Sequence, residues 1–392
     1  MKILFLPENY FPNVSGVPVV VKYLAEGLHA KGHEVTIATK TFNDEPLVDN
    51  INGVRVHRFD MHVDWKKSYV GNIDQYIDFV LSFNADVNIL ECSQCITTDV
   101  LLRHLGKLQG KTIFHSHGFS GLDLEMFAFK GDLKHTIGNT YNWLLSKVYF
   151  GYTLPKAMPN IDATLCLSEV DNSREFLEKH CRNHYILDNA ADDMFFDGHV
   201  SANLLSKYTT LENNCYVMSC ANYQYIKDQV SIINEYYASE SSKNMSLVCI
   251  GSQKNSYYEE CVRTVETNER KYGHRDVHLL VGVDRSDIPA IEKNASLYLV
   301  ASRCERYSIS IIEAMSQGVP FISTNVGNAR VLPGGVTLFD GDKMSDKIDY
   351  LLTHKDEYDK YSKAGLEFAY KNCRIDAVVD KLENILKETV NG

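Results

Sequence analysis

The sequence predicts an α/β protein made of two doubly wound, Rossmann-like domains. Short apolar strands alternate with amphipathic helices along the chain, and a second half repeats this alternation. A chain of 392 residues with 44% hydrophobic content is long enough to bury two separate cores. We expect the first domain to cover 1–195 and the second to cover 196–364.

The first half begins with a βαβ unit. Residues 2–6 form an apolar run, 17–30 have helical periodicity, and 34–39 form the next apolar run, so a parallel sheet is expected. Further strands are predicted at 54–59, 87–90, 112–115 and 163–167.

A helix over 133–152 is rich in aromatic residues, which are Tyr141, Trp143, Tyr149, Phe150 and Tyr152. Such a face could contact a membrane. The net charge of −11 does not favour that contact, so we expect these side chains to pack inside the domain.

The second half begins after Asp197 and Gly198. Its expected elements are a strand at 216–220, a helix at 228–238, and segments at 247–250, 277–281, 288–293 and 296–301. A charged helical stretch at 361–389 ends the pattern, with no short repeat or low-complexity segment.

The composition excludes several classes of protein. A net charge of −11 argues against a general nucleic-acid binder, which needs basic surface to neutralise phosphates. The start of the chain has too short an apolar run for a signal peptide, and no later run is long enough to span a bilayer. We therefore expect a cytoplasmic protein.

The ten cysteines are scattered among apolar segments, so we expect them to be reduced. Cys92 and Cys95 have the spacing of a redox or zinc half-site, but no second pair lies at zinc-ribbon spacing. The pair is predicted to be the end of a strand.

Two glutamates, Glu305 and Glu313, flank the run 306–312. An apolar strand and a polar loop come before them, and a helix should begin near Ser308 and end at Gly318. Burying an ionised carboxylate costs several kcal/mol without compensation, so Glu313 needs a polar partner. The helix N-terminus is also suited to an anion such as diphosphate.

Glu305, Glu313, the Gly318-Val-Pro320 turn, the strand at 321–324 and Gly327 resemble the signature of the retaining GT-B glycosyltransferases of group one. The resemblance extends over nearly the whole chain. It implies two Rossmann-like domains facing a central cleft. It also implies that a last helix, at about 365–392, crosses back to the acceptor domain, leaving 196–364 as the donor domain.

The resemblance also assigns the donor site. Lys227 matches a lysine that grips the diphosphate, and Glu305 is expected to face the donor sugar. Asn222 replaces the usual arginine, which weakens the grip because a charge-assisted hydrogen bond is worth roughly 1.5–3 kcal/mol. Compensating cations could come from Arg303, Arg306 or Arg330.

The other expected donor contacts follow the same resemblance. Gly251, Val281 and Gly282 would meet the base, and Glu313 would hold the ribose hydroxyls. The phosphates would meet the amides of Tyr307, Ser308 and Ile309, where the family often has Phe and Gly at the first two positions.

In the first domain, the loop at 8–16 matches a family loop that usually carries a Gly-Gly pair near the donor phosphate and acceptor. Ser15 takes the first position of this pair and Gly16 the second. The chain has no Gly-x-Gly-x-x-Gly at this turn, so a dinucleotide-dependent dehydrogenase is poorly supported.

His117 best matches the active-site histidine of the family, and His115 is the alternative. The His-x-His pair could be half of a metal site, but the sequence shows no third ligand. Together with Glu305 and Lys227, His117 completes the expected catalytic group.

Residues 186–192 resemble a family segment at the crossover between domains, with Ala190 in place of a glycine. Loops at 65–72 and 119–131 are expected to shape the acceptor pocket.

The sequence therefore predicts a retaining glycosyltransferase that uses a nucleoside diphosphate sugar, with uridine as the expected nucleoside, and an unidentified hydroxyl acceptor. No metal or other cofactor is expected. The alternatives are a sugar-nucleotide epimerase or glycogen-type phosphorylase on the same fold, and a non-catalytic glycosyltransferase-like binding subunit. Asn222 motivates the last of these.

Overall fold

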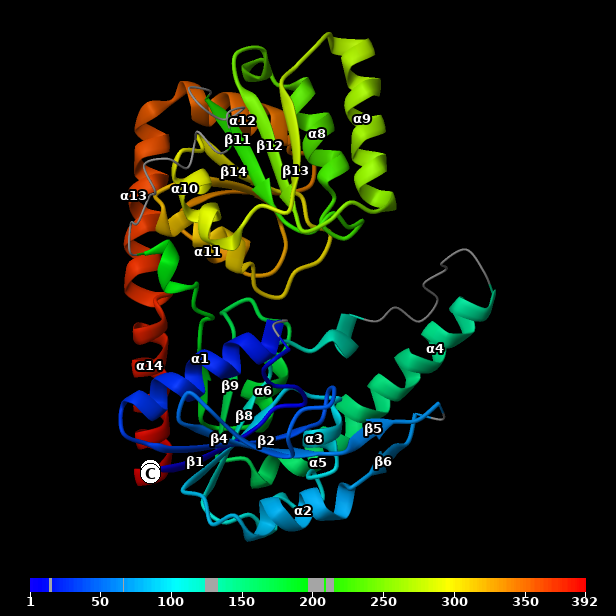
Figure 1. Cartoon of the computed structure of the whole chain (residues 1–392), viewed down its shortest axis with the longest axis vertical. Coiled ribbons are helices and arrows are strands. Elements are labelled where there is room, and N and C mark those ends of the chain that lie inside the picture. Colours follow the sequence, from blue (N-terminus) through cyan, green and yellow to red (C-terminus); the bar gives the residue numbers. More distant parts are fainter. Residues whose placement is uncertain (14–15, 66, 124–132, 197–207, 209–214) are drawn as a thin grey trace. The chain divides into compact units, whose positions relative to one another are not determined.

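The computed structural model describes residues 1–13, 16–65, 67–123, 133–196, 208 and 215–392. Asp197, Gly198, Ser15 and most of the loop at 119–131 lie outside these ranges. The chain divides into two compact units, Met1–Asp188 with Val378–Gly392 (unit 1) and Asn189–Ala377 (unit 2). Both units are α/β, as Figure 1 shows.

Unit 1 contains an eight-stranded sheet in the order β10-β9-β8-β7-β1-β2-β4-β3. All neighbours are parallel except β3 and β4, which are antiparallel. The strands are β1 (Lys2–Leu6), β2 (Glu34–Lys40), β3 (Val48–Ile51), β4 (Val54–Phe59), β7 (Val87–Glu91), β8 (Lys111–His115), β9 (Ala163–Cys166) and β10 (His184–Ile186). A separate hairpin pairs β5 (Met61–Val63) with β6 (Tyr69–Gly71).

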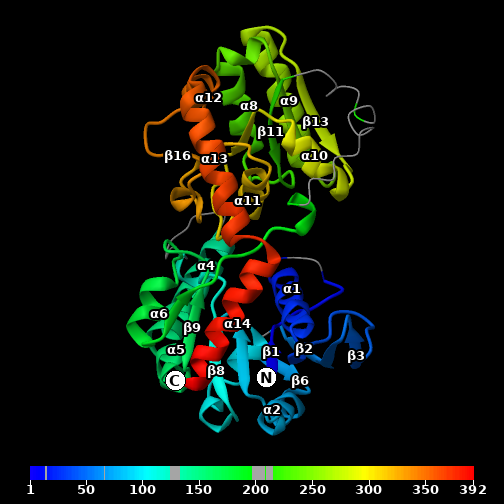
Figure 2. The ribbon, with the colours of Figure 1, turned by 90° about the vertical axis from the view of Figure 1, so that its left-hand side faces the viewer.

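The helices of unit 1 are α1 (Gly16–Ala30), α2 (Ile73–Ser82), α3 (Ile96–Asp99), α4 (Leu133–Val148), α5 (Leu154–Ala157) and α6 (Arg174–His180). The C-terminal helix α14 (Ile375–Asn391) packs on α1, as Figure 2 shows. Gly27 leaves room for Val379, because a Cβ at position 27 would lie 2.5 Å from a Val379 methyl carbon. Glu383 accepts a bond from His33 Nε2 at 3.0 Å.

Unit 2 contains a six-stranded parallel sheet in the order β13-β12-β11-β14-β15-β16. The strands are β11 (Tyr216–Cys220), β12 (Ser246–Gly251), β13 (Val277–Val281), β14 (Leu297–Val300), β15 (Phe321–Thr324) and β16 (Gly335–Leu338). The helices are α8 (Gln229–Ala238), α9 (Ser256–Tyr272), α10 (Ile288–Lys293), α11 (Ile309–Ser316), α12 (Met344–Thr353) and α13 (Lys355–Asn372). The strands predicted for both sheets are therefore present.

The stretch predicted as helical at 361–389 is two helices, α13 and α14, separated at Cys373 and Arg374. The first part stays in unit 2, because Gly365 of α13 packs closely on Gly334 and Met315. A Cβ at position 365 would lie 2.8 Å from the Gly334 Cα, so the helix touches backbone there.

The prediction that the aromatic helix packs inside its domain is wrong for its outer face. Tyr141 is 51% exposed and Tyr152 is 63% exposed, whereas Phe150 is buried against Phe119 with ring centroids 4.7 Å apart. Helical periodicity identifies two faces of such a helix, and both faces here carry apolar residues. Among the described residues, no helix has the length and apolar content needed to cross a bilayer.

None of the ten cysteines, all of which lie in described segments, forms a disulfide. Cys92 directly follows β7, and its amide donates to the His115 carbonyl at 2.9 Å. Burial raises the pKa of the Cys95 thiol to about 11, so this thiol is protonated at neutral pH.

Candidate functional site

The carboxyl ends of the unit 2 strands bring several predicted site residues to one edge of the sheet. Lys227, in the loop after β11, bonds through Nζ to Oε1 of Glu305, in the loop after β14. The Ser302 hydroxyl donates to the same Glu305 oxygen at 2.8 Å. In parallel sheets this edge is where ligands bind. The lysine and the carboxylate are therefore held together at the position expected for a ligand.

Asn222 presents an exposed side chain on the loop after β11, and its backbone carbonyl accepts a bond from Gln229 Nε2 at 3.0 Å. Arg303, one of the expected compensating cations, is engaged elsewhere. Its Nη2 lies 2.6 Å from Asp228 Oδ2, and its guanidinium stacks on Tyr225 at 4.2 Å from the ring centroid.

A hollow of about 790 Å³ opens beside this loop at the ends of β14, β15 and β16. Its lining includes Arg303, Ser302, Asp228, Thr324 and Asp340. The hollow therefore combines one cation with several oxygen atoms that can accept or donate hydrogen bonds.

Helix α11 begins directly after Ser308, as predicted, but Ser308 makes no side-chain cap. Its backbone amide donates instead to Asn328 Oδ1 at 2.8 Å, so this amide is occupied by the protein itself. Tyr307 is buried and Ile309 is half-buried at the helix start. Of the three amides expected to meet phosphate, the one of Ser308 would first have to exchange Asn328 for the ligand.

Gly327 allows the Glu305 loop to pack. Its φ is +51°, and a Cβ there would lie 3.0 Å from the Arg306 carbonyl oxygen and 3.2 Å from the Glu305 Cβ. A larger residue would push on the loop that carries Glu305.

Glu313 lies on α11 with only 3% of its surface exposed, and its Oε1 accepts a bond from Arg285 Nη2. Arg285 follows β13 and stacks on Phe195 at 4.9 Å from the ring centroid. The need of Glu313 for a polar partner is therefore met by a cation that the sequence did not single out. No spacing rule links positions 285 and 313, because helix α10 and strand β14 intervene.

A second carboxylate, Glu292 on α10, lies near this pair and is fully buried. Within the described part of the chain, neither of its oxygens has a hydrogen-bond partner. Burial, followed by the charge of Glu313, raises the pKa of Glu292 well above its usual value. Burial also raises the pKa of Glu313, and Arg285 opposes that rise.

The glycines predicted to meet the base differ in their surroundings. Gly251, at the end of β12, is covered by Tyr223, and a Cβ there would lie 2.4 Å from Tyr223 Cδ2. The Tyr223 hydroxyl donates to the Cys249 carbonyl at 2.9 Å. Gly282 is exposed with a φ of +67° and no atom near its Cβ position, and Val281 is half-buried.

In unit 1, Gly16 is exposed and begins α1 with a φ of +23°. His117 follows β8 with a φ of +51° and is buried. Its Nε2 lies 2.5 Å from Oε2 of Glu91, the last residue of β7, and His115 Nδ1 lies 3.1 Å from the same oxygen. Glu91 was not singled out from the sequence. The available signal was a charged residue directly after the apolar run 87–90, with His115 and His117 at and just after the end of the next predicted strand.

Glu91 is ionised in this cluster. Burial alone would raise its pKa, but the charges and hydrogen bonds of His115 and His117 outweigh burial and lower the pKa to about 2. Burial and the neighbouring His115 lower the pKa of His117. The imidazole of His117 is therefore uncharged at neutral pH.

The cluster also corrects the view that the two histidines lack a third candidate ligand. One atom from each of Glu91, His115 and His117 lies within 4.8 Å of the others, and zinc accepts such a set. His117 Nε2 is hydrogen-bonded directly to Glu91 Oε2, so we interpret the cluster as a carboxylate that fixes the orientation of His117. Among the described residues, Glu91 Oε1 has no hydrogen-bond partner.

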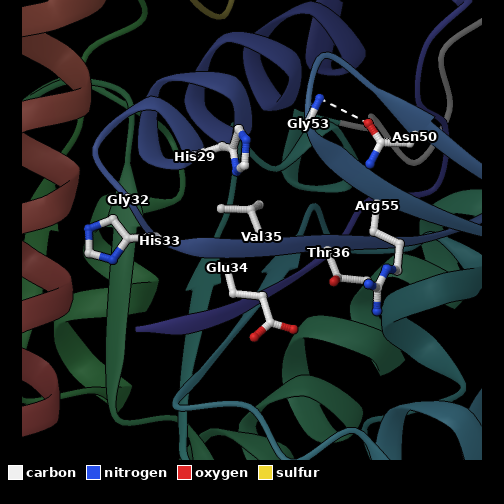
Figure 3. A pocket seen from close by; sticks show the side chains of 9 residues that line it. All are labelled: His29, Gly32, His33, Glu34, Val35, Thr36, Asn50, Gly53 and Arg55. Atoms are coloured by element: carbon white, nitrogen blue, oxygen red, sulfur yellow. Dashed lines mark hydrogen bonds between the residues drawn. The ribbon is translucent and has the colours of Figure 1, made fainter.

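A hollow of about 330 Å³ between α1 and β4 lies at the opposite edge of the unit 1 sheet. Figure 3 shows its lining, which includes His29, Glu34, Asn50 and Arg55. Glu34 is the first residue of β2, so this hollow lies toward the amino ends of the strands. It contains none of the predicted site residues.

Comparison with known proteins covers both units. Residues 14–182 match the family model described as Glycosyltransferase Family 4, and residues 215–354 match the model described as Glycosyl transferases group 1. The chain is 22% identical over 344 residues to a subunit of the phosphatidylinositol N-acetylglucosaminyltransferase of Arabidopsis thaliana. The match spans 85% of this chain and 69% of that protein.

Solved structures share the fold. Sucrose-phosphate synthase of Thermosynechococcus elongatus has a TM-score of 0.71 at 14% identity, covering 99% of this chain and 98% of that one. Anabaena HepE in complex with UDP and glucose has a TM-score of 0.68 at 14% identity over 99% and 100% of the two chains. WaaG, a glycosyltransferase involved in lipopolysaccharide biosynthesis, has a TM-score of 0.65 at 15% identity over 98% and 99%. These matches establish the GT-B fold of the chain.

Proposed function

Because this chain belongs to the group 1, family 4 glycosyltransferases, we propose that it moves a hexosyl group from a UDP-sugar to an acceptor hydroxyl with retention. The observation that carries this proposal is the bond between Lys227 and Glu305 at the carboxyl edge of the unit 2 sheet. A cation for the diphosphate and a carboxylate for the sugar stand side by side there. The choice of UDP is supported by the HepE structure, which holds UDP and glucose.

In this scheme Lys227 exchanges its hydrogen bond to Glu305 for one to the diphosphate. The carboxylate of Glu305 is then free to accept a hydrogen bond from the donor sugar. Lys227 and the first amides of α11 stabilise the charge that develops as the bond between the anomeric carbon and the phosphate oxygen breaks. The acceptor oxygen forms the new bond, and its proton passes to the departing phosphate. The scheme requires no metal, because protein groups supply the positive charge.

Glu313 would bind the ribose diol, since a carboxylate accepts two hydrogen bonds. Arg285 holds one of its oxygens, so the ribose must share or displace that bond. His117, oriented by Glu91, would bond a sugar hydroxyl.

A second candidate is a binding subunit that has lost its chemistry. Asn222 brings no charge, and Asp228 already pairs with Arg303. Such a subunit would show no saturable binding of UDP- or GDP-sugars by calorimetry, whereas the transferase would bind one of them.

The test is a thermal-shift screen of nucleotide sugars on the full chain. A ligand at a hundred times its dissociation constant stabilises the folded protein by about 2.7 kcal/mol. We expect a UDP-sugar to give this shift and Lys227→Ala to lose most of it. Lys243→Ala is the matched control, because Lys243 also bonds a glutamate in unit 2, at an exposed site. Equal shifts in both variants would remove Lys227 from the donor site.

A further inference from the structure

The outer face of α4 carries a continuous row of apolar side chains. Its members on α4 are Tyr141, Leu144, Leu145 and Val148, and the row continues with Tyr152 in the π-helical segment Tyr149–Thr153 that follows. We call these five side chains the α4 stripe. Their spacing follows the helical period, so they share one side of the helix. They are 41% to 63% exposed, whereas Ser146 and Phe150 on the other side are buried. A contiguous exposed apolar surface of this kind marks a contact with another molecule or a membrane.

The charge around the α4 stripe is positive. Residues 133–161 contain three lysines and no Asp or Glu, although the whole chain has a net charge of −11. Lys156 Nζ lies 5.6 Å from the Tyr152 ring centroid, and Lys147 Nζ lies 5.7 Å from that of Trp143. Basic and aromatic groups are therefore interleaved on this face.

The β5–β6 hairpin extends the same surface, and Figure 1 shows it beside α4. Lys67 in its turn bonds the Asn142 amide oxygen, and its Nζ lies 5.1 Å from the Tyr141 ring centroid. The neighbouring Trp65 is 88% exposed. Asp64, the acidic residue of the turn, accepts the Ser68 amide at 2.7 Å. Exposed Trp and Tyr rings near lysines are the composition that membrane interfaces favour.

We propose that the α4 stripe and the hairpin turn form a surface that docks on an anionic lipid bilayer. The apolar side chains would enter the boundary between headgroups and acyl chains, and Lys67, Lys147 and Lys156 would lie among the anionic headgroups. A second copy of the chain fits less well. A two-fold contact would bring lysines toward lysines, and 133–161 offers no carboxylate to pair with them.

This inference goes beyond the proposed function and uses none of its donor-site residues. It also revises the expectation that the acidic net charge disfavours a membrane. A net charge averages over the whole surface, whereas binding depends on the charge within about a Debye length of the contact.

The first test is co-sedimentation of the full chain with vesicles, without any sugar nucleotide. We expect binding to mixed phosphatidylcholine and phosphatidylglycerol vesicles, weakened by salt, and little binding to phosphatidylcholine alone. Equal binding to both vesicles, or no binding to the anionic ones, would overturn the proposal. This comparison needs only the wild-type protein.

The second test uses variants. Leu144→Glu with Leu145→Glu should lower the partition coefficient roughly tenfold or more, and Lys147→Ala about fivefold. Leu366→Glu is the control, because Leu366 is also a partly exposed helical leucine, on α13 of unit 2. Unchanged binding in the double variant contradicts the proposal. So does a wild-type dimer, seen by sedimentation equilibrium, that the double variant dissociates.

The outcomes separate this surface from the donor site. Lys227→Ala should bind anionic vesicles like the wild type, and the leucine double variant should keep its thermal shift with the nucleotide sugar. Loss of vesicle binding in Lys227→Ala would count against a separate lipid surface.

Discussion

Each unit buries carboxylates near its candidate site, and the pKa values of these carboxylates shift in opposite directions in the two units. In unit 1, Glu91 faces two imidazoles, which lower its pKa to about 2. In unit 2, Glu313 and Glu292 face each other with one arginine nearby, and burial raises the pKa of both. Burial is the leading influence in all three cases. The two imidazoles outweigh the burial of Glu91, whereas Arg285 does not outweigh the burial of Glu313.

Removing Glu91 should give the largest effect on stability. Glu91→Ala leaves two buried imidazoles without their carboxylate, and breaking a buried pair costs about 3–5 kcal/mol. Chemical denaturation should show this loss in unit 1. Glu178→Ala is the control, because Glu178 pairs with Arg174 at the surface of the same unit. Surface pairs contribute about 1 kcal/mol or less. Similar losses in both variants would mean that the Glu91 cluster is not tightly coupled.

Arg285→Ala should give a smaller loss. It leaves Glu313 and Glu292 close together without a cation, but Arg285 is half-exposed and water screens part of its charge. We expect unit 2 to lose about 1–2 kcal/mol at neutral pH, measured by denaturant unfolding.

Glu292→Gln in the Arg285→Ala background should recover most of this loss of stability. The substitution removes one of two buried carboxyl groups that interact unfavourably through their charges. Arg270→Ala, at an exposed position on α9, is the matched control and should have little effect. If the second substitution recovers nothing, the two glutamates are not coupled.

The smallest expected effect is an opposite pH dependence of the two units. The pKa of His117 is lower in the folded state than its usual value near 6.5, so the stability contribution of His117 is lost as pH falls below that value. The contribution of Glu91 is lost only from about pH 4.5 toward 2.

The pKa values of Glu313 and Glu292 are raised, so their contributions are complete at low pH and are lost as pH rises. Hydrogen exchange between pH 7.5 and 5 should therefore show β7 and β8 becoming less protected and α10 and α11 more protected. A change of the same sign in both units would refute the assignment of charges.

The sequence predicted the central strands because each of them is a short apolar run bounded by polar residues. It missed β3, β5, β6, β10 and β16, which are three or four residues long. The run at 87–90, for example, is β7 with one further residue. The predicted strand stopped one residue short, at 90, because Glu91 is charged and ends the apolar run. The backbone of Glu91 nevertheless continues the strand. The cluster depends on which strands are neighbours, and the sequence alone does not give the order of strands in the sheet.

The partner of Glu313 was predictable in kind but not in identity. Burial of a carboxylate requires a polar partner, and the structure supplies Arg285, 28 positions earlier in the chain. The outer face of α4 shows a different limit. Its period identified an apolar face, but a period does not distinguish a face that packs on the core from one that meets a membrane or solvent.

The contact between Tyr223 and Gly251 links the loop after β11 to the end of β12. Any side chain at position 251 would displace the Tyr223 ring, whose loop continues to Lys227. A side chain at position 251 therefore requires a smaller residue at position 223. The last residue of β12 thus constrains the shape of the loop that positions Lys227.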